Sequence, residues 1–319
     1  MSSTRRARSC IALAMTLVVA SSLMALGGCA GATGSREIEL VPVVSSPAVG
    51  TSGVLKVGIN STNAPYAGFS GGNMVGIDVD VAAALAEEMG LKLELVDLAG
   101  QSADTLLTEG TVDVVMDVEQ TGGSVIRGTQ IGPYVESGPA LFTLVRSSSE
   151  VPNVELQTLA GVKVAAQKDS LSAWSVDELI GSGTSDPRES LAAAFEAVET
   201  GQITYAAADA VVGSYLALEY ADLACVKMLG RPIGVYLGVA RDNTQLADAV
   251  TVALRTIRDN GEMKIILSKW LGPVSALVVA GSSAITSEAT GTSSSGSSVA
   301  EGQIDAGNDL PDPSNANGA

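Results

Sequence analysis

Short apolar runs alternate with amphipathic, alanine-rich runs between residues 53 and 272. Strand-like runs occupy 54–60, 92–97, 112–118, 139–146, 162–167, 205–212, 224–229 and 234–241, and helix-like runs occupy 83–89, 102–110, 170–179, 186–201, 244–261 and 261–272. This alternation predicts an α/β fold of mostly parallel sheets, covered by helices on both faces. The pattern alone leaves open whether the folded part is one large domain or two lobes.

Acidic residues stand at the predicted start of three helices. Asp78 or Asp80 would cap the helix that Gly90 ends, and Asp169 would cap the helix over 170–179. Asp186, followed by Pro187, would cap the helix over 186–201. Such side chains accept hydrogen bonds from the unpaired N–H groups of a first turn, and proline suits its first position.

The N-terminus is typical of a bacterial export signal. Arg5, Arg6 and Arg8 precede a nearly unbroken apolar run over 11–25, and Leu26-Gly27-Gly28-Cys29 resembles the lipobox of bacterial lipoproteins. We therefore expect residues 1–28 to be a signal peptide and Cys29 to be lipidated, which would anchor the protein outside the cytoplasm. The alternative is an uncleaved membrane anchor, for which the apolar run is short, since a spanning helix needs about 20 residues.

Both flanks of the folded part are poor in large apolar side chains. Residues 29–53 are predicted to be a flexible spacer, and residues 281–319, rich in Ser, Gly and acid, a disordered tail. The formal charge of −17 argues against nucleic acid as a partner. The chain has no His, and Cys225 is the only thiol of the predicted folded part, so we expect no metal, no cofactor and no internal disulfide.

Seven segments in register resemble the bacterial extracellular solute-binding proteins of family 3, which feed amino acids to ABC importers. They are VGIN…APY (57–66), VGIDVDVAAALAEEMGLKLELV (75–96), LLTEGTVDVV (106–115), GPYVESGPALFTLV (132–145), LAGVKVAAQKDS (159–170), ETGQITYAAADAV (199–211) and LGVARDN…ALRTIRDNGEMKIILSKWLG (237–272). The resemblance implies a solute-binding domain over 54–272 built as two doubly wound lobes. Lobe one would hold 54–140 and 236–272, lobe two 146–231, and a two-segment hinge would lie near 139–147 and 230–238.

The same resemblance implies a function. The chain would be an extracytoplasmic, monomeric substrate-binding lipoprotein that captures an amino acid or related amine between its lobes and delivers it to an ABC transporter permease. It would not be an enzyme. A dehydratase-like enzyme on the same fold and a ligand sensor without a transport role are the alternatives, and Glu119 is the evident candidate acid or base for the first.

The family's motifs match several site residues of this chain. Asp209 matches the Asp that binds the ligand's ammonium group, and Gln167 and Ser170 match positions that contact its carboxylate. The first loop supplies Asn60, Asn63 and Tyr66, and the family's Thr falls near Glu119 or Gln120. The family's carboxylate-binding Arg falls on Ser124 or Val125, so Arg127 is either its replacement or an ordinary exposed Arg.

Acidic side chains outnumber basic ones at the expected cleft. Asp117, Glu119, Asp169 and Asp209 all lie at predicted strand ends or loops facing it, whereas the two acids of GIDVD are expected to brace the first helix. An acidic cleft attracts cations and repels anions. Basic or neutral amino acids and amines are therefore expected to bind better than glutamate or aspartate.

Overall fold

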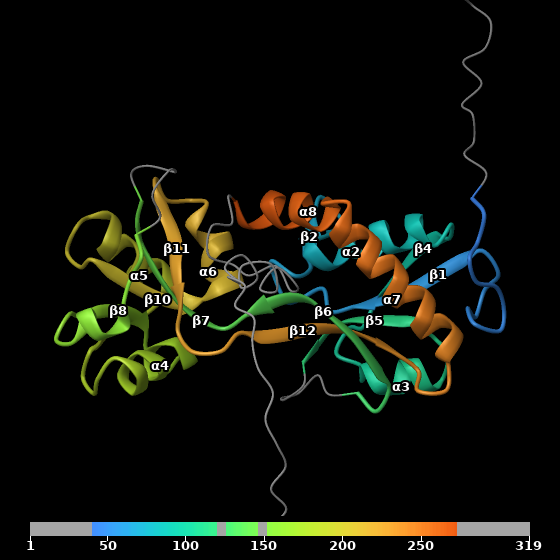
Figure 1. Ribbon diagram of the computed structural model, residues 1–319, viewed down its shortest axis with the longest axis horizontal. Helices are drawn as coiled ribbons and strands as arrows, with labels where there is room; N and C mark the ends of the chain where they lie inside the picture. The colour runs from blue at the N-terminus through green and yellow to red at the C-terminus, as the bar shows by residue number, and fades with distance from the viewer. Residues whose placement is uncertain (1–39, 120–125, 146–151, 273–319) are drawn as a thin grey trace, which may run out of the picture.

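The computed structural model describes residues 40–119, 126–145 and 152–272. The predicted signal peptide, Cys29 and the tail over 281–319 lie outside these ranges. Within them, the chain builds two separate five-stranded sheets with helices on both faces, which confirms the α/β architecture (Figure 1).

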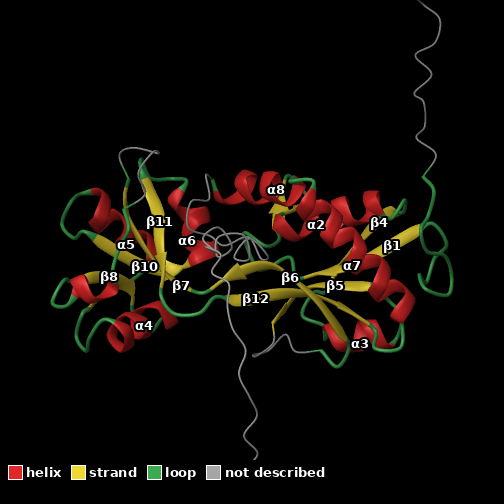
Figure 2. Cartoon of the chain, in the orientation of Figure 1, coloured by secondary structure: helices red, strands yellow, loops and turns green. Residues whose placement is uncertain are grey.

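The first sheet contains strands from both ends of the described chain. Its order is β4-β1-β5-β12-β6, with β1 Val54–Ile59, β4 Lys92–Asp97, β5 Val114–Glu119, β6 Thr129–Ser137 and β12 Ile233–Val239. Its helices are α2 Ile77–Glu88, α3 Ala103–Thr108, α7 Thr244–Asp259 and α8 Glu262–Leu271, and β2 Gly68–Ser70 pairs with β3 Asn73–Val75 beside it. Helices α2, α7 and α8 lie on one side of this sheet and α3 on the other (Figure 2).

The second sheet has the order β11-β7-β10-β8-β9. Its strands are β7 Pro139–Leu144, β8 Val164–Gln167, β9 Ser185–Arg188, β10 Tyr205–Asp209 and β11 Leu223–Met228. The short helix η1 Leu156–Leu159 precedes β8, and the helices are α4 Leu171–Leu179, α5 Leu191–Glu199 and α6 Ala210–Ala217.

Alternation along the central strands supplies a core on each face. In β5, Val114 and Met116 pack under α2 and α7, while Val115 packs with Leu106 and Leu107 of α3. In β10, Ala206 and Ala208 face the α5 and α6 side and Ala207 the α4 side. Successive strand residues point to opposite faces, so these nearly continuous apolar runs fit strands covered on both sides.

The chain crosses between the sheets twice. Gly138 alone separates β6 from β7, and residues 229–232 separate β11 from β12. The first crossing therefore precedes the hinge expected near 139–147, where β7 instead pairs with β10 and β11 inside the second sheet. Strand β12 is antiparallel to β5 in the first sheet, and β7 is antiparallel to β10 in the second. Both sheets are therefore mixed rather than mostly parallel.

The expected flexible spacer is wrong from residue 43 onward. Val44, Ala48 and Val49 are buried, the amide N–H of Val43 donates to Met89 O, and Asn243 Nδ2 donates to Ala48 O. The apolar run LVPVV over 40–44, followed by Ala48 and Val49, was the signal for this packing against helices from distant parts of the chain.

The three predicted caps are corrected as well. Ser190 caps α5, because residues 185–188 form β9, and Ser170 rather than Asp169 caps α4 by accepting from Ala173 N. Helix α2 begins after Gly76 without a side-chain cap. Asp78 is instead buried, and Asp80 accepts hydrogen bonds from Lys269 and Trp270.

Candidate functional site

Predicted site residues from both lobes lie at the carboxyl ends of parallel strands. Asp209 ends β10 and Gln167 ends the adjacent β8, whose Ala166 is opposite Ala207. In the first sheet, Gly58 of β1 is opposite Val115 of the parallel strand β5. Asn60 and Asp117, each two residues further on, therefore lie near the carboxyl ends of these two adjacent strands. Ligands of open α/β sheets bind outside this edge.

Asp209 is held at the point where the two lobes meet. Its carboxylate accepts from Ser137 Oγ at 2.7 and 2.8 Å and from the N–H groups of Gly138, Val211 and Val212 at 3.0–3.1 Å. Ser137 ends β6 of the first sheet, whereas Asp209 caps α6 beside the second. Five short contacts fix the orientation of this carboxylate next to the chain crossing.

Tyr66 comes from the first lobe and lies beside the same carboxylate. It is 6 % exposed, and its hydroxyl group lies near Ser137. Burial raises the pKa of Tyr66, and the carboxylates of Asp209, Asp117 and Asp78 raise it further. Among the described residues, the charged groups that shift this pKa are thus all acidic.

Asp117 occupies a bulge in β5. Tyr236 of β12 is opposite Val118 and Gly238 is opposite Val115, so Met116 and Asp117 together oppose the one residue between them. Asp117 has a φ of +58°, a left-handed conformation that is uncommon outside glycine but tolerated by Asp and Asn. Its Oδ2 accepts a 2.6 Å hydrogen bond from Asn63 Nδ2, and its N–H donates to Tyr134 Oη at 3.2 Å.

Asp78 lies behind Tyr134, deeper in the first lobe. The Tyr134 hydroxyl donates a 2.5 Å hydrogen bond to Asp78 Oδ1, and Asp78 Oδ2 has no hydrogen-bond partner among the described residues. Burial, reinforced by the nearby Asp117, raises the pKa of Asp78 to about 8. Asp78 is therefore mostly protonated at neutral pH. We call Tyr66, Asp78, Asp117, Tyr134, Ser137 and Asp209 the Asp209 cluster.

The other predicted residues lie nearby or have local roles. Asn60 Oδ1 accepts from the N–H and hydroxyl of Thr62, and Ser170 caps α4. Gln167 is exposed at the end of β8. Glu119 ends β5, but its side chain, like all of Gln120, lies outside the described part of the structure.

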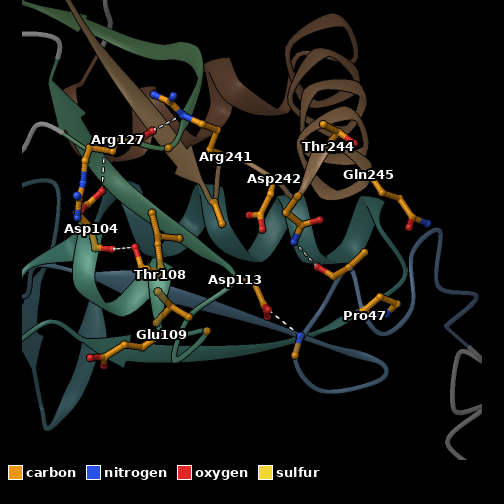
Figure 3. Close-up of a pocket in the computed structure, with 18 residues that line it drawn as sticks. Pro47, Asp104, Thr108, Glu109, Asp113, Arg127, Arg241, Asp242, Thr244 and Gln245 are labelled. Carbon is orange, nitrogen blue, oxygen red and sulfur yellow. Dashed lines mark hydrogen bonds and ion pairs between the residues drawn. The ribbon is translucent and has the colours of Figure 1, made fainter.

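Arg127 is not brought to the Asp209 cluster. Its guanidinium group donates to Asp104 Oδ2 at 2.7 and 2.9 Å, beside an open groove of about 880 Å³ that Asp104, Arg241 and Asp242 also line (Figure 3). Arg127 precedes β6, whereas Ser137 ends it. Eight residue steps of this strand separate its two ends by about 26 Å.

Ser137 was missed in the sequence, although it joins Asp209 to Tyr66. Its signal was its place immediately before Gly138-Pro139, where one strand ends and the next begins. A serine has no motif-level signature there. Only the crossing of the chain makes its hydroxyl a link between the lobes.

Two features are absent from the described part of the chain. No cluster of three or more Cys, Asp or Glu side chains has the geometry to hold a metal ion. None of the described helices has the length and apolar character needed to cross a membrane.

Comparison with solved structures supports the fold. The L-cystine solute receptor of Neisseria gonorrhoeae, in its unliganded open conformation, is 22% identical, with 69% of this chain and 92% of that chain covered and a TM-score of 0.59. A polar amino acid ABC uptake transporter substrate-binding protein from Streptococcus thermophilus is 21% identical, with 71% and 88% covered and a TM-score of 0.58.

Comparison of sequences leads to the same group of proteins. The ABC transporter glutamine-binding protein GlnH of Bacillus subtilis is 24% identical over 210 residues, which are 63% of this chain and 74% of that protein. The family model for the bacterial extracellular solute-binding proteins, family 3, matches residues 55–273, more than half of the chain. The chain belongs to the bacterial extracellular solute-binding proteins, family 3.

Proposed function

We propose that the protein captures a small ligand with an ammonium group at the Asp209 cluster and delivers it to an ABC importer. The observation that carries the proposal is the position of Asp209, whose carboxylate is held by Ser137 from one lobe and by the start of α6 in the other. A carboxylate fixed in this way pairs well with an ammonium group as water is excluded.

The ligand class is supported by charge and by the relatives. The carboxylates of Asp209, Asp117 and Asp78 raise the pKa of the Tyr66 hydroxyl, and no Lys or Arg among the described residues contributes to this shift. The relatives named above are a glutamine-binding protein, an L-cystine receptor and a polar amino acid binding protein. We therefore propose an amino acid or related amine rather than an acidic solute.

Lobe closure would enclose the ligand. Lobe one would comprise 54–137 and 233–272, and lobe two 139–228, with Gly138 and residues 229–232 as hinge. These two short crossings are supported by the strand pairing. Hinge closure of two lobes around a ligand is a known mode of motion in binding proteins.

Binding rather than catalysis is the role we propose. Each oxygen of Asp209 already accepts hydrogen bonds from the protein, which fixes this carboxylate in place for binding a cation. A dehydratase-like activity would appear as turnover of the bound ligand. If product analysis detected this turnover, an enzymatic role would replace the proposed transport role.

A lipid anchor at Cys29 is part of the proposal. It rests on the apolar run over 11–25 and on the sequence LGGC that follows. Cys29→Ser should move the monomeric protein from the membrane fraction into the soluble fraction. Retention in the membrane would favour the uncleaved anchor.

The binding role is tested by a thermal-shift screen with amino acids and amines, followed by calorimetry. A ligand that binds only the native state raises the melting temperature. Asp209→Asn keeps the shape and removes the charge, so it should lower ligand affinity by roughly ten- to a hundredfold. Asp222→Asn is the matched control, because Asp222 is an exposed residue with a φ of +63° that Asn also tolerates. Equal affinity of both variants would remove Asp209 from the site.

A further inference from the structure

We propose that Asp117 binds a second cationic group of the ligand, which makes the protein a receptor for dicationic amines such as basic amino acids or diamines. This inference rests on the binding role proposed above. Asp209 would take one ammonium group and Asp117 the other. Asp117, in the first lobe, would thus determine ligand specificity, in addition to the ammonium site at Asp209 in the second lobe.

The first step is the placement of Asp117. Without the bulge, residue 117 would continue the alternation of β5, with its side chain on one face of the sheet. The bulge and the φ of +58° redirect it toward Asn63, in the loop that also carries Tyr66. Left-handed backbone costs free energy for a residue other than glycine. The Asn63 and Tyr134 hydrogen bonds offset this cost and hold the carboxylate at the Asp209 cluster.

The second step is the relation of Asp117 to Asp209. Both carboxylates raise the pKa of the Tyr66 hydroxyl, so both lie near the same side chain, one from each lobe. The backbone N–H of Asp117 donates to Tyr134 Oη, and the Asp209 carboxylate accepts from Ser137 Oγ, so both acids are tied to β6. Two anionic groups from different lobes near one buried Tyr suit a flexible chain with a cation at each end.

The third step is the balance of charge in the Asp209 cluster. Among the described residues, no Lys or Arg contributes to the pKa shifts of Asp78, Tyr134 and Tyr66, and nearby carboxylates raise all three pKa values. Asp78 is mostly protonated at neutral pH, so the charge of the cluster comes from the carboxylates of Asp117 and Asp209 rather than from Asp78. Cations neutralise this charge.

The experiment compares lysine with two ligands that each lack one of its charged groups. Lysine carries two ammonium groups, norleucine lacks the side-chain ammonium, and cadaverine lacks the carboxylate. Calorimetry on the whole protein should show lysine or cadaverine binding at least about tenfold more tightly than norleucine. Comparison of the affinities for lysine and cadaverine then shows whether the carboxylate of the ligand contributes to binding.

Asp117→Asn separates recognition from folding. Asn adopts the same backbone conformation and can still accept from Asn63, so the fold should persist and only the charge is lost. The variant should reduce the affinity for lysine or cadaverine by about tenfold or more and leave norleucine binding unchanged. Asp222→Asn again serves as the control.

The outcomes distinguish the two proposals. Norleucine binding as tightly as lysine, or an equal loss for both in Asp117→Asn, would overturn the second cation site and leave the binding role in place. Binding of glutamine without binding of any dication would likewise overturn the second cation site and leave the binding role in place. No binding of any amine or amino acid by a folded protein would overturn both proposals.

Discussion

The Tyr134 hydroxyl donates a 2.5 Å hydrogen bond to Asp78 Oδ1 in the interior of the first lobe. Tyr134 is fully buried, and its oxygen also accepts from the N–H of Asp117. Through this one hydroxyl, a buried acid of α2 is connected to the bulge of β5. The backbone at Asp117 is therefore coupled to the protonation and packing of Asp78.

Asp78→Asn should flatten the pH dependence of stability. The pKa of Asp78 is raised from 3.8 to about 8 in the native state. Native protein thus holds a proton that unfolded protein has lost, so this contribution to stability is complete below about pH 4 and is lost as pH rises toward 8. Asn stays neutral and preserves the acceptor for Tyr134. Denaturant unfolding at about pH 5 and pH 8 should show a smaller loss of stability in the variant than in the unmodified protein. A parallel loss in both proteins would show that Asp78 titrates normally.

Arg127→Gln should leave ligand affinity unchanged within about twofold. Arg127 pairs with Asp104 at the far end of β6 from Ser137, so its charge is distant from the Asp209 cluster. Calorimetry with the tightest ligand of the screen measures the effect, and Asp209→Asn provides the comparison. A loss as large as that of Asp209→Asn would show that Arg127 reaches the ligand's carboxylate in the bound state.

Asp113→Ala should lower the free energy of unfolding by about 2–4 kcal/mol. Asp113 is 8% exposed, and its two oxygens accept 2.8 Å hydrogen bonds from the N–H groups of Gly50 and Lys56. Removal of this carboxylate leaves both donors unpaired and loosens the N-terminal segment over 43–50. Denaturant unfolding measures the loss, with Asp248→Ala, at an exposed position of α7, as control. Faster hydrogen exchange at 43–50 should accompany it, and slow exchange there would contradict the proposed tether.

Gly213→Ala should destabilise the second lobe by about 1–3 kcal/mol, although alanine favours helices over glycine by about 1 kcal/mol. A Cβ at Gly213 of α6 would lie 2.5 Å from Phe142 Cζ and 2.8 Å from Ala208 Cβ. These atoms belong to the core beneath α6, and their displacement would also disturb the start of this helix at Asp209. Gly68→Ala is the control, because its Cβ would meet no atom closer than 4.0 Å. Thermal unfolding that shows the same small change for both variants would contradict the close packing of α6.

Local patterns were enough to predict most elements and the family. The runs over 54–60, 92–97 and 162–167 became β1, β4 and β8, because apolar periodicity and β-branched side chains reflect burial within one segment. Asp209 was also found from its motif, since its place between a strand and a helix is a property of neighbouring residues. The helix start at Asp186 failed because Ser185–Arg188 pairs with β8, a contact that no local pattern records.

The tertiary structure decided which charges meet. Sequence spacing left Arg127 either at the ligand or at the surface, and the fold pairs it with Asp104. It assigned the acids of GIDVD to separate places, Asp78 to the interior and Asp80 to Lys269 and Trp270. It also set Ser137 and Tyr66 beside Asp209, across the two lobes. Such contacts join residues 23–190 positions apart, and their energies depend on burial and on neighbouring charge, which arise only when the whole chain has folded.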